Sequence, residues 1–238
     1  MSEPYLLLWL EAPLQSWGYD SKFGRRDSLD FPTKSGVLGL LCCALGAGSK
    51  QIDWLASWAD RDMVVEAFIR QDTQGKPLVR EPLLRDFQMV GSGYDDQDPW
   101  QNLLIPKKSD GKKAVGGGTK MTYRYYLQDM AFAVALQGPQ AELKILADAL
   151  QNPVWDLYLG RKNCAPTEFI GQGIYQSLQE TLDKAQQFAA SEEKNRASAF
   201  RVLQGEHEGE VITLNDVPIQ FGEHKLYRDR RVTIIATE

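Results

Sequence analysis

The sequence predicts an α+β fold with a ferredoxin-like or RRM-like core, and three features of the chain lead to that prediction. Segments with strand and helix character follow one another as β-α-β twice within residues 1–176. The two halves are separated by an interruption over about residues 72–128, whereas ordinary hairpin connections have about 2 to 5 residues. Residues 177–238 hold one helical pattern and several β-prone runs. We therefore expect a first domain over residues 1–176 that carries the insertion, and a helix plus a small β-rich extension over residues 177–238.

The first half begins with an apolar strand and a helix rich in small residues. Tyr5 to Leu10 is apolar and β-prone enough for a central strand, and glycines and a proline mark the residues after it as an irregular loop. Thr33 or Ser35 can cap a helix that Gly46 ends. One face of that helix is apolar, and a second face has small residues that let either a strand or a nucleic-acid strand approach closely. The apolar face is Leu38, Leu41, Cys42 and Leu45, and the small face is Gly36, Gly39 and Cys43.

The remaining core elements follow from apolar spacing. Two strands are expected to form the central hairpin, one on each side of the insertion, and two helices are expected to cover the sheet. The strands are Met63 to Arg70 and Met130 to Leu136, and the helices are Ile52 to Trp58 and Gln140 to Leu150. A fourth strand is expected near Asp156 to Leu159 or just after it.

The last third reads as a helix followed by strands. Ser177 to Gln187 has helical spacing, and Ala189 to Ser198 is polar enough to be an exposed loop. Strands are expected at Phe200 to Leu203, Glu210 to Leu214 and Arg231 to Ala236, as a small second sheet or hairpin.

Composition favours a cytoplasmic protein without metal or cofactor. The chain has 238 residues with 43% hydrophobic content, enough to bury a core. Its longest apolar run, Val37 to Leu45, is far below the roughly 18 residues needed to span a bilayer. Cys42, Cys43 and Cys164 form neither a CxxC motif nor a disulfide framework, so reduced, buried thiols are expected.

The net charge of −5 is unevenly distributed. Four windows, residues 22–34, 107–124, 158–163 and 223–231, together carry +11, which leaves −16 for the rest of the chain. A single window of this kind is usually a solvated face, but four such windows beside glycines indicate phosphate contact on an acidic body.

The insertion combines basic and aromatic residues. Lysines can neutralise phosphates, and tyrosine rings can stack on unpaired bases, at about 1 to 3 kcal/mol per base. Alternating tyrosines are also typical of a strand with one buried face, so one face at most needs a function. The lysines are Lys107, Lys108, Lys112, Lys113 and Lys120, and the tyrosines are Tyr123, Tyr125 and Tyr126.

Catalytic groups are few. His207 and His224 are the only histidines of the chain, and each fits an ordinary surface position. Asp95, Asp96 and Asp98 read as a solvated acidic loop. Metal-free RNA cleavage needs a general acid and a base, and Lys120 with Tyr125 and Tyr126 could supply part of that chemistry.

Three stretches of the sequence carry a resemblance to one known family. The first stretch runs from Ala12-Pro13-Leu14-Gln15-Ser16-Trp17-Gly18 through Phe23-Gly24-Arg25-Arg26 to Phe31-Pro32-Thr33-Lys34-Ser35-Gly36-Val37-Leu38-Gly39-Leu40-Leu41. The second is Tyr158-Leu159-Gly160-Arg161-Lys162-Asn163-Cys164, and the third pairs Arg85-Asp86-Phe87 with Thr122-Tyr123-Arg124-Tyr125-Tyr126-Leu127. These stretches resemble the CasD or "Cas-five" subunits of type I-E CRISPR Cascade complexes, within the RAMP superfamily. The resemblance spans most of the chain and weakens after about Gly173, and Ala12 stands where the family has a glycine.

The resemblance implies a non-catalytic subunit that binds CRISPR guide RNA and caps its 5′ handle. It implies that the insertion is a projecting β-hairpin thumb that reaches the backbone subunit, and that the large subunit, which examines target DNA, docks nearby. Target DNA within the assembled complex is a further candidate contact. The RNA-binding residues would be Gln15, Trp17, Arg25, Arg26, Lys34, Tyr158, Arg161 and Lys162, with the insertion's lysines and Tyr125.

Two other functions stay open at this point. Type I-C relatives are metal-independent endoribonucleases that process the repeat RNA with a tyrosine, a lysine and a histidine, but no histidine precedes residue 207 here. The third alternative is a scaffold whose basic windows are ordinary surface.

Overall fold

A seven-stranded antiparallel sheet forms the centre of the molecule. The structure is a computed structural model that describes residues 3–19, 21, 24–90, 97–104, 107–112 and 120–237. The strand order is β10-β11-β9-β4-β7-β1-β8, and every neighbouring pair is antiparallel. The strands are β1 (Tyr5–Glu11), β4 (Met63–Arg70), β7 (Ala131–Gln137), β8 (Gly171–Tyr175), β9 (Arg196–Gln204), β10 (Glu210–Gln220) and β11 (Leu226–Ala236). The predicted combination of helices with an antiparallel sheet is confirmed, as is the pairing of β4 with β7.

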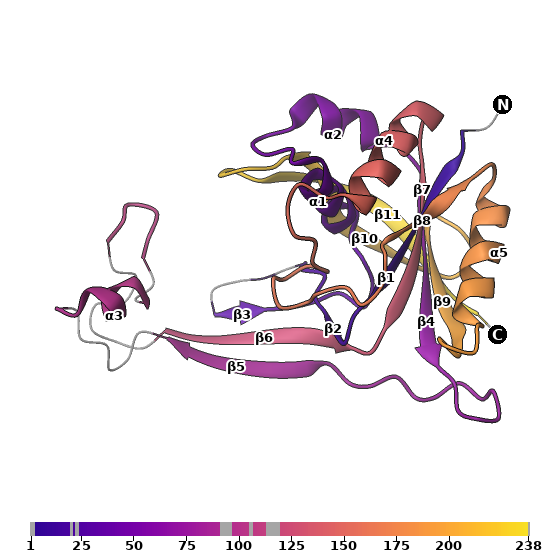
Figure 1. Ribbon diagram of the computed structural model, residues 1–238, viewed down its shortest axis with the longest axis horizontal. Helices are drawn as coiled ribbons and strands as arrows, with labels where there is room; N and C mark the ends of the chain where they lie inside the picture. Colours follow the sequence, from indigo (N-terminus) through magenta and orange to yellow (C-terminus); the bar gives the residue numbers. More distant parts are fainter. Residues whose placement is uncertain are drawn as a thin grey trace.

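Helices cover both faces of this sheet (Figure 1). Helices α1 (Lys34–Leu45), α2 (Ile52–Trp58) and α4 (Gln140–Gln151) lie on one face, and α5 (Leu178–Ala189) lies on the other. Successive strand residues point to opposite faces, so the even residues of β1, such as Leu8, pack with α1 and α4, while Trp9 packs with α5. The layers explain why β1 is buried along its whole length. No helix in the described part of the chain is long and apolar enough to cross a membrane.

The ends of α1 form as the sequence indicates. Thr33 is the N-cap, and its Oγ1 accepts a hydrogen bond of 3.1 Å from the backbone N–H of Gly36. Gly46 ends the helix in the left-handed conformation, with φ of 66°. The carbonyls of Cys43 and Ala44 accept hydrogen bonds from the backbone N–H groups of Trp155 and Val154, at 3.3 and 3.0 Å. The loop after α4 is therefore tied to the end of α1.

The position of the strand beside β1 differs from the prediction. Asp156 to Leu159 lies in a loop, and β8 begins only at Gly171. The main chain of Leu159 forms hydrogen bonds to the loop and to a distant segment instead of to a strand. Its N–H donates to Cys164 O at 2.8 Å, and its carbonyl accepts from Ser16 N at 3.1 Å.

Of the two alternatives for the C-terminal strands, the separate second sheet is wrong, while the hairpin is present as the antiparallel pair β10 and β11. β9 pairs with β4, and β11 pairs with β9, so these strands extend the main sheet. The expected exposed loop over Ala189 to Ser198 is wrong in its second half, because β9 begins at Arg196 and both Lys194 and Arg196 are buried. Their charges are matched by Glu11, 3.1 Å from Lys194 Nζ and 3.0 Å from Arg196 Nη2. A polar run can thus be interior when its ion-pair partner lies on a distant strand.

A two-stranded arm projects from the body (Figure 1). Its strands β5 (Leu84–Val90) and β6 (Lys120–Gln128) pair antiparallel from Leu84–Tyr126 to Val90–Lys120, and α3 (Pro99–Leu104) lies beyond its far end. At the base of the arm, β6 also pairs with β2 (Leu14–Gln15) and, in parallel, with β3 (Arg25–Arg26).

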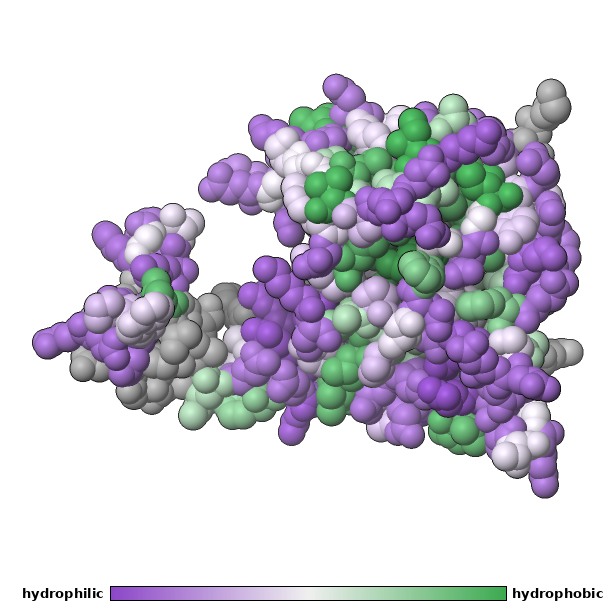
Figure 2. All heavy atoms as spheres, in the orientation of Figure 1, coloured by the Kyte–Doolittle hydropathy of each residue, from purple (hydrophilic) through white to green (hydrophobic). Residues whose placement is uncertain are grey.

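The two faces of the arm differ in chemistry. Phe87, Met89, Met121 and Tyr123 are all exposed, and their register places them together on one face. Figure 2 shows apolar side chains along one edge of the arm. Arg124 is on the opposite face, which looks toward the loop at residues 158–163.

Candidate nucleic-acid interface

Two cavities that share the lining residues Tyr158 and Gly160 lie along the body and the arm, and together they are called the groove. The inner cavity, about 430 Å³, lies between α1 and the β10–β11 hairpin, and the outer cavity, about 550 Å³, lies between residues 158–163 and the arm. Tyr158 and Gly160 line both cavities. The outer cavity is completed by Gln88, Arg124, Arg161, Lys162 and Asn163.

The loop over residues 158–164 is held tightly against the Gln15–Trp17 segment. Leu159 and Cys164 are both buried. The backbone N–H of Leu159 donates a hydrogen bond to Cys164 O at 2.8 Å, and the backbone N–H of Cys164 donates one to Arg161 O at 2.8 Å. Gly160 has φ of 96°, and a Cβ there would lie 1.7 Å from Ser16 O. Only glycine allows this approach of two backbones, which leaves the side chains of Arg161 and Lys162 on the groove.

Arg161 joins three segments of the chain. Its guanidinium donates hydrogen bonds to Tyr125 O at 3.2 Å and to Arg26 O at 2.9 Å, and lies 4.6 Å from the centre of the Tyr126 ring. Arg161 therefore positions β6 and β3 beside its own loop, a role that the sequence did not indicate. Lys162 is exposed at the same groove and is the freer cation of the two.

The exposed end of β3 supplies Arg25 and Arg26. Arg25 lies 4.9 Å from the centre of the Tyr125 ring and donates from Nε to both carboxylate oxygens of Asp27, at 2.8 and 2.9 Å. These hydrogen bonds raise the pKa of Arg25, so it stays cationic. The ring of Tyr125, predicted to stack on a base, thus already has a guanidinium over one face.

Gln15 and Trp17, expected to touch RNA, are interior residues, and of the two only Trp17 lines the inner cavity. The Gln15 amide is fully buried and donates to Leu10 O at 3.1 Å and to Met130 O at 2.7 Å, which joins the end of β1 to the start of β7. Trp17 is 1% exposed, and its indole N–H donates to Gln15 Oε1 at 3.2 Å. A buried amide with polar partners is satisfied within the fold, so we leave both residues out of the interface except as its supports.

Lys34, also expected to touch RNA, is a third interior residue. Its ammonium is buried and donates to Ala59 O at 2.8 Å, Arg61 O at 2.6 Å and Gln204 Oε1 at 3.3 Å. Burial, with the nearby positive charge of Arg230, lowers the pKa of Lys34 to about 8. The side chain closes the C-terminal end of α2 instead of facing a phosphate.

Replacement of Lys34 is expected to destabilise the fold. Lys34→Met should lower the free energy of unfolding by about 1 to 3 kcal/mol, because the carbonyls of Ala59 and Arg61 lose a charged donor. Urea unfolding measures the change, and Lys144→Met on the exposed side of α4 is the matched control. A Lys34→Met protein as stable as the control would contradict the structural role.

The stability difference between the wild type and Lys34→Met is also expected to depend on pH. Between a folded-state pKa of about 8 and the ordinary value of 10.5, the unfolded chain binds more protons at Lys34 than the folded chain does. This group therefore adds stability as pH rises through that window. The stability gap between the wild type and Lys34→Met should widen between pH 8 and pH 10, and a narrowing gap in urea titrations would contradict it.

The insertion lysines whose side chains the structure describes are not gathered at the groove. Lys107, Lys108 and Lys112 are exposed in a turn beyond the far end of the arm, closed by Lys108 N to Lys112 O at 2.8 Å. Lys113 lies outside the described residues, as do Lys22, Phe23, Asp95, Asp96 and the glycines at 116–118. Lys120 begins β6, and only its backbone is described.

The basic window over residues 223–231 is largely neutralised by the fold. Arg228 pairs with Asp60, Arg230 with Asp216 at 2.7 Å, and Arg231 with Glu206. Lys225 forms no ion pair within the described part of the chain and lines the inner cavity. Sequence reasoning missed its neighbours there, Trp155 and Phe221, because no linear motif links these residues.

The candidate catalytic groups do not meet in one site. His207 and His224 are exposed, in the turns that precede β10 and β11. Tyr126 is buried beneath Arg161, and Asp98 accepts from Trp100 N and Gln101 at the start of α3. Among the residues described, no three His, Cys, Asp or Glu side chains are grouped as a metal site.

Comparison with known proteins gives consistent likenesses over body and arm. A family model described as CRISPR-associated protein (Cas_Cas5) matches residues 5–233. The CRISPR system Cascade subunit CasD of Escherichia coli (strain K12) is 32% identical over 176 residues, which cover 73% of this chain and 72% of that protein. A solved chain of a CRISPR RNA-guided surveillance complex matches with a TM-score of 0.70 at 28% identity, over 98% of this chain and 90% of its own length. A second solved chain, from a crystal structure of a Cas protein, matches with a TM-score of 0.60 at 27% identity, over 98% of this chain and 94% of its own length.

Proposed function

The chain belongs to the CRISPR-associated protein (Cas_Cas5) family, and on that premise we propose that it is a Cascade subunit that binds guide RNA without cutting it. Its site would hold the 5′ handle of the guide RNA, as a cap on the assembly. The CasD relative is named as a Cascade subunit, and a surveillance complex contains a chain of the same fold.

The observation that carries the proposal is the pair of neighbouring cavities that share Tyr158 and Gly160. Single-stranded RNA is bound by cations along its backbone and by rings on which unpaired bases stack. The outer cavity has Arg124, Arg161 and Lys162, and the inner cavity has aromatic rings. On a chain with net charge −5, this local positive surface favours a phosphate backbone.

The arm is proposed to be the thumb of a ferredoxin-like RAMP core. Its face with Arg124 would lie along the guide, and its end would reach the neighbouring backbone subunit. Its apolar face, with Met89 and Met121, suits a protein surface, because Met and aromatic residues are enriched in interfaces. The large subunit would dock nearby, and target DNA would meet the chain only inside the complex.

Incubation with repeat RNA in EDTA tests the function directly. Salt-sensitive binding without cleavage supports the proposal. Cleavage would support the alternative, a metal-independent endoribonuclease, and neither binding nor cleavage would support a scaffold. The geometry favours binding because His207 and His224, the only histidines, are in separate turns while Tyr126 is buried.

Ionic strength should control the affinity for RNA. If a handful of phosphates are neutralised, log affinity should fall linearly with log salt with a slope of roughly −3 to −5, since each contact on a single strand contributes about −0.7. Fluorescence anisotropy with a labelled handle RNA measures the slope, and a scrambled RNA is the control for specificity. A flat salt response would contradict the electrostatic part of the proposal.

A further inference from the structure

We propose that the inner cavity holds one unstacked nucleobase of the bound RNA strand. The inference rests on the proposed function. It assigns one base of the RNA to the inner cavity and the phosphates of the strand to the outer cavity. The volume of about 430 Å³ is within the range of about 300 to 1,000 Å³ that is typical of small-ligand sites.

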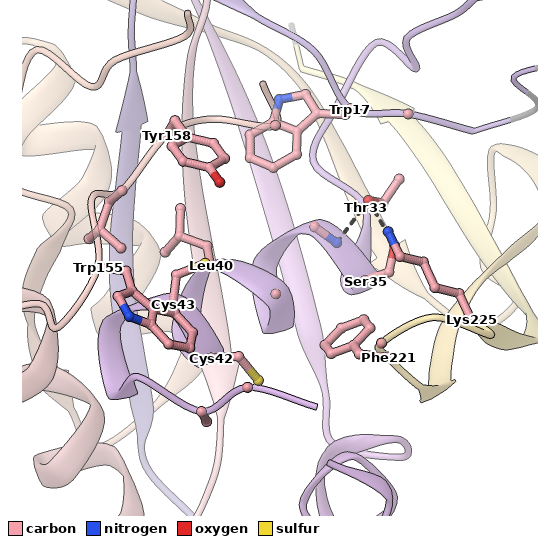
Figure 3. Close-up of a pocket in the computed structure, with 18 of the residues that line it drawn as sticks. Trp17, Thr33, Ser35, Leu40, Cys42, Cys43, Trp155, Tyr158, Phe221 and Lys225 are labelled. Atoms are coloured by element: carbon pink, nitrogen blue, oxygen red, sulfur yellow. Dashed lines mark hydrogen bonds between the residues drawn. The ribbon is translucent and has the colours of Figure 1, made fainter. Parts of the chain in front are cut away.

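Three of the five aromatic residues that line this space come from two separate parts of the chain. Trp155 and Tyr158 come from the loop after α4, and Phe221 comes from the β10–β11 hairpin. Figure 3 shows these three side chains arranged around α1 at the cavity. Every base has a π-face, so rings placed in this way accept an unstacked base by stacking. Trp155 is 47% exposed, which is a large apolar surface to leave in water.

The floor of the cavity is open because of one glycine in α1. A Cβ on Gly39 would have a single neighbour within 4 Å, the Phe221 ring at 3.9 Å. Gly36 differs, because a Cβ there would meet the Trp17 ring at 2.8 Å and Thr33 Oγ1 at 2.9 Å. Packing therefore explains Gly36 but not Gly39, whose absent side chain leaves room for a ligand although glycine weakens a helix.

The polar groups of the cavity suit a base more than a phosphate. Lys225 is the only charged side chain among the described residues that line it, and it extends toward Thr33 and Ser35 at the first turn of α1 (Figure 3). The Ser35 and Tyr158 hydroxyls can each donate and accept a hydrogen bond, as the edge of a base requires. Cations are concentrated instead in the outer cavity, with Arg124, Arg161 and Lys162.

The walls are held in place by the main chain. Trp155 N donates to Cys43 O at 3.3 Å, and Phe221 N donates to Lys50 O at 3.0 Å. Trp155 is thus attached to the last turn of α1, and Phe221 is attached to the segment that joins α1 to α2. A site whose walls are already ordered loses little freedom when a ligand enters.

The test fills the cavity from its floor. Gly39→Leu places a side chain in the proposed base site, whereas Gly39→Ala adds a carbon only 3.9 Å from Phe221 and is the matched control. Both variants should fold, and Gly39→Ala should melt about 2 to 4 °C higher than the wild type because alanine favours a helix. Each full-length protein is titrated with handle RNA that carries 2-aminopurine at one position at a time.

The expected result is an affinity loss of at least about fivefold for Gly39→Leu, which corresponds to one lost stacked base, with none for Gly39→Ala. At one position of the RNA, binding of the wild-type protein should quench the 2-aminopurine fluorescence. Binding of the Trp155→Ala protein should leave that fluorescence unquenched. Trp100→Ala, on the exposed surface of α3, should leave the quenching unchanged.

Two outcomes would overturn the inference in different ways. If Gly39→Leu binds RNA like the wild type and no position is quenched, the base site is wrong while the RNA-binding function stands. Normal RNA affinity with impaired co-purification of other subunits would assign the cavity to a protein side chain. If the wild type itself does not bind handle RNA, the proposed function fails first, and the base site fails with it.

Discussion

Gly160→Ala is expected to destabilise the protein by about 3 kcal/mol or more, because the added Cβ meets the shortest contact of any glycine in the described residues. The added Cβ would lie 1.7 Å from Ser16 O, where no rotamer change can relieve the contact because both sides are backbone. The loop must move away from the Gln15–Trp17 segment, and the hydrogen bond from Ser16 N to Leu159 O is lost with it. RNA affinity should fall together with stability, since Tyr158 and Lys162 are carried by this loop.

Gly75→Ala is the matched control for Gly160→Ala. Gly75 also has a positive φ, 78°, but no atom lies within 4 Å of its Cβ position. It should therefore show the backbone cost alone, about 1 to 2 kcal/mol. Thermal unfolding of both variants separates the clash from the backbone term. Equal destabilisation of the two proteins would mean that the close approach at Ser16 has no energetic consequence.

The second large effect is expected from the two cations of the same loop. Arg161→Ala with Lys162→Ala should weaken handle binding by about 1 to 3 kcal/mol, as charge-assisted contacts to phosphate are removed. The single variants should differ, because Lys162 is exposed while Arg161 also holds Tyr125 O and Arg26 O. Lys162→Ala should reduce affinity at unchanged stability, and Arg161→Ala should reduce both.

Lys184→Ala on α5, on the opposite face of the sheet, is the control for this series. Affinity and melting temperature are measured in the same buffer for the wild type, the double variant, the two single variants and Lys184→Ala. Unchanged affinity in a folded double variant would remove the loop from the RNA site. An Arg161→Ala protein that melts like the wild type would instead show that its two backbone hydrogen bonds contribute little.

The sequence predicts most helices and strands because their signals are local. The caps of α1, Thr33 and Gly46, are at its ends, and β4 has the predicted bounds of Met63–Arg70. β8 was harder to place, because Gly171–Tyr175 is short and only partly buried. The C-terminal strands are found by their composition, but their neighbour is not, since β9 pairs with a strand more than a hundred residues earlier.

The site is less predictable because a polar residue type does not say where its side chain points. Gln15 and Lys34 are in a stretch that reads as polyanion-binding, yet Gln15 bonds Met130, 115 residues away, and the Lys34 ammonium bonds Ala59, 25 residues away. Likewise, the arginines near residue 230 look free in the sequence and are paired in the fold. Of the cations that remain at the groove, Arg161 and Lys162 are in the Tyr158–Asn163 loop, where the motif is densest, whereas Arg124 is on the arm and Lys225 is in the β10–β11 hairpin.

The way in which the arm leaves the body has a mechanical consequence. β6 ends at Gln128 and β7 begins at Ala131, so the arm is continuous with a central strand through a turn at Asp129. That turn is clamped by Arg70 and by Arg196, whose Nη2 lies 2.9 Å from Asp129 Oδ1. β7 is in turn bonded to β1 and β4 along its length. The base of the arm is therefore fixed both by ion pairs and by a strand in the middle of the sheet, and we expect the arm to act as a stiff lever between neighbouring subunits and not as a tether.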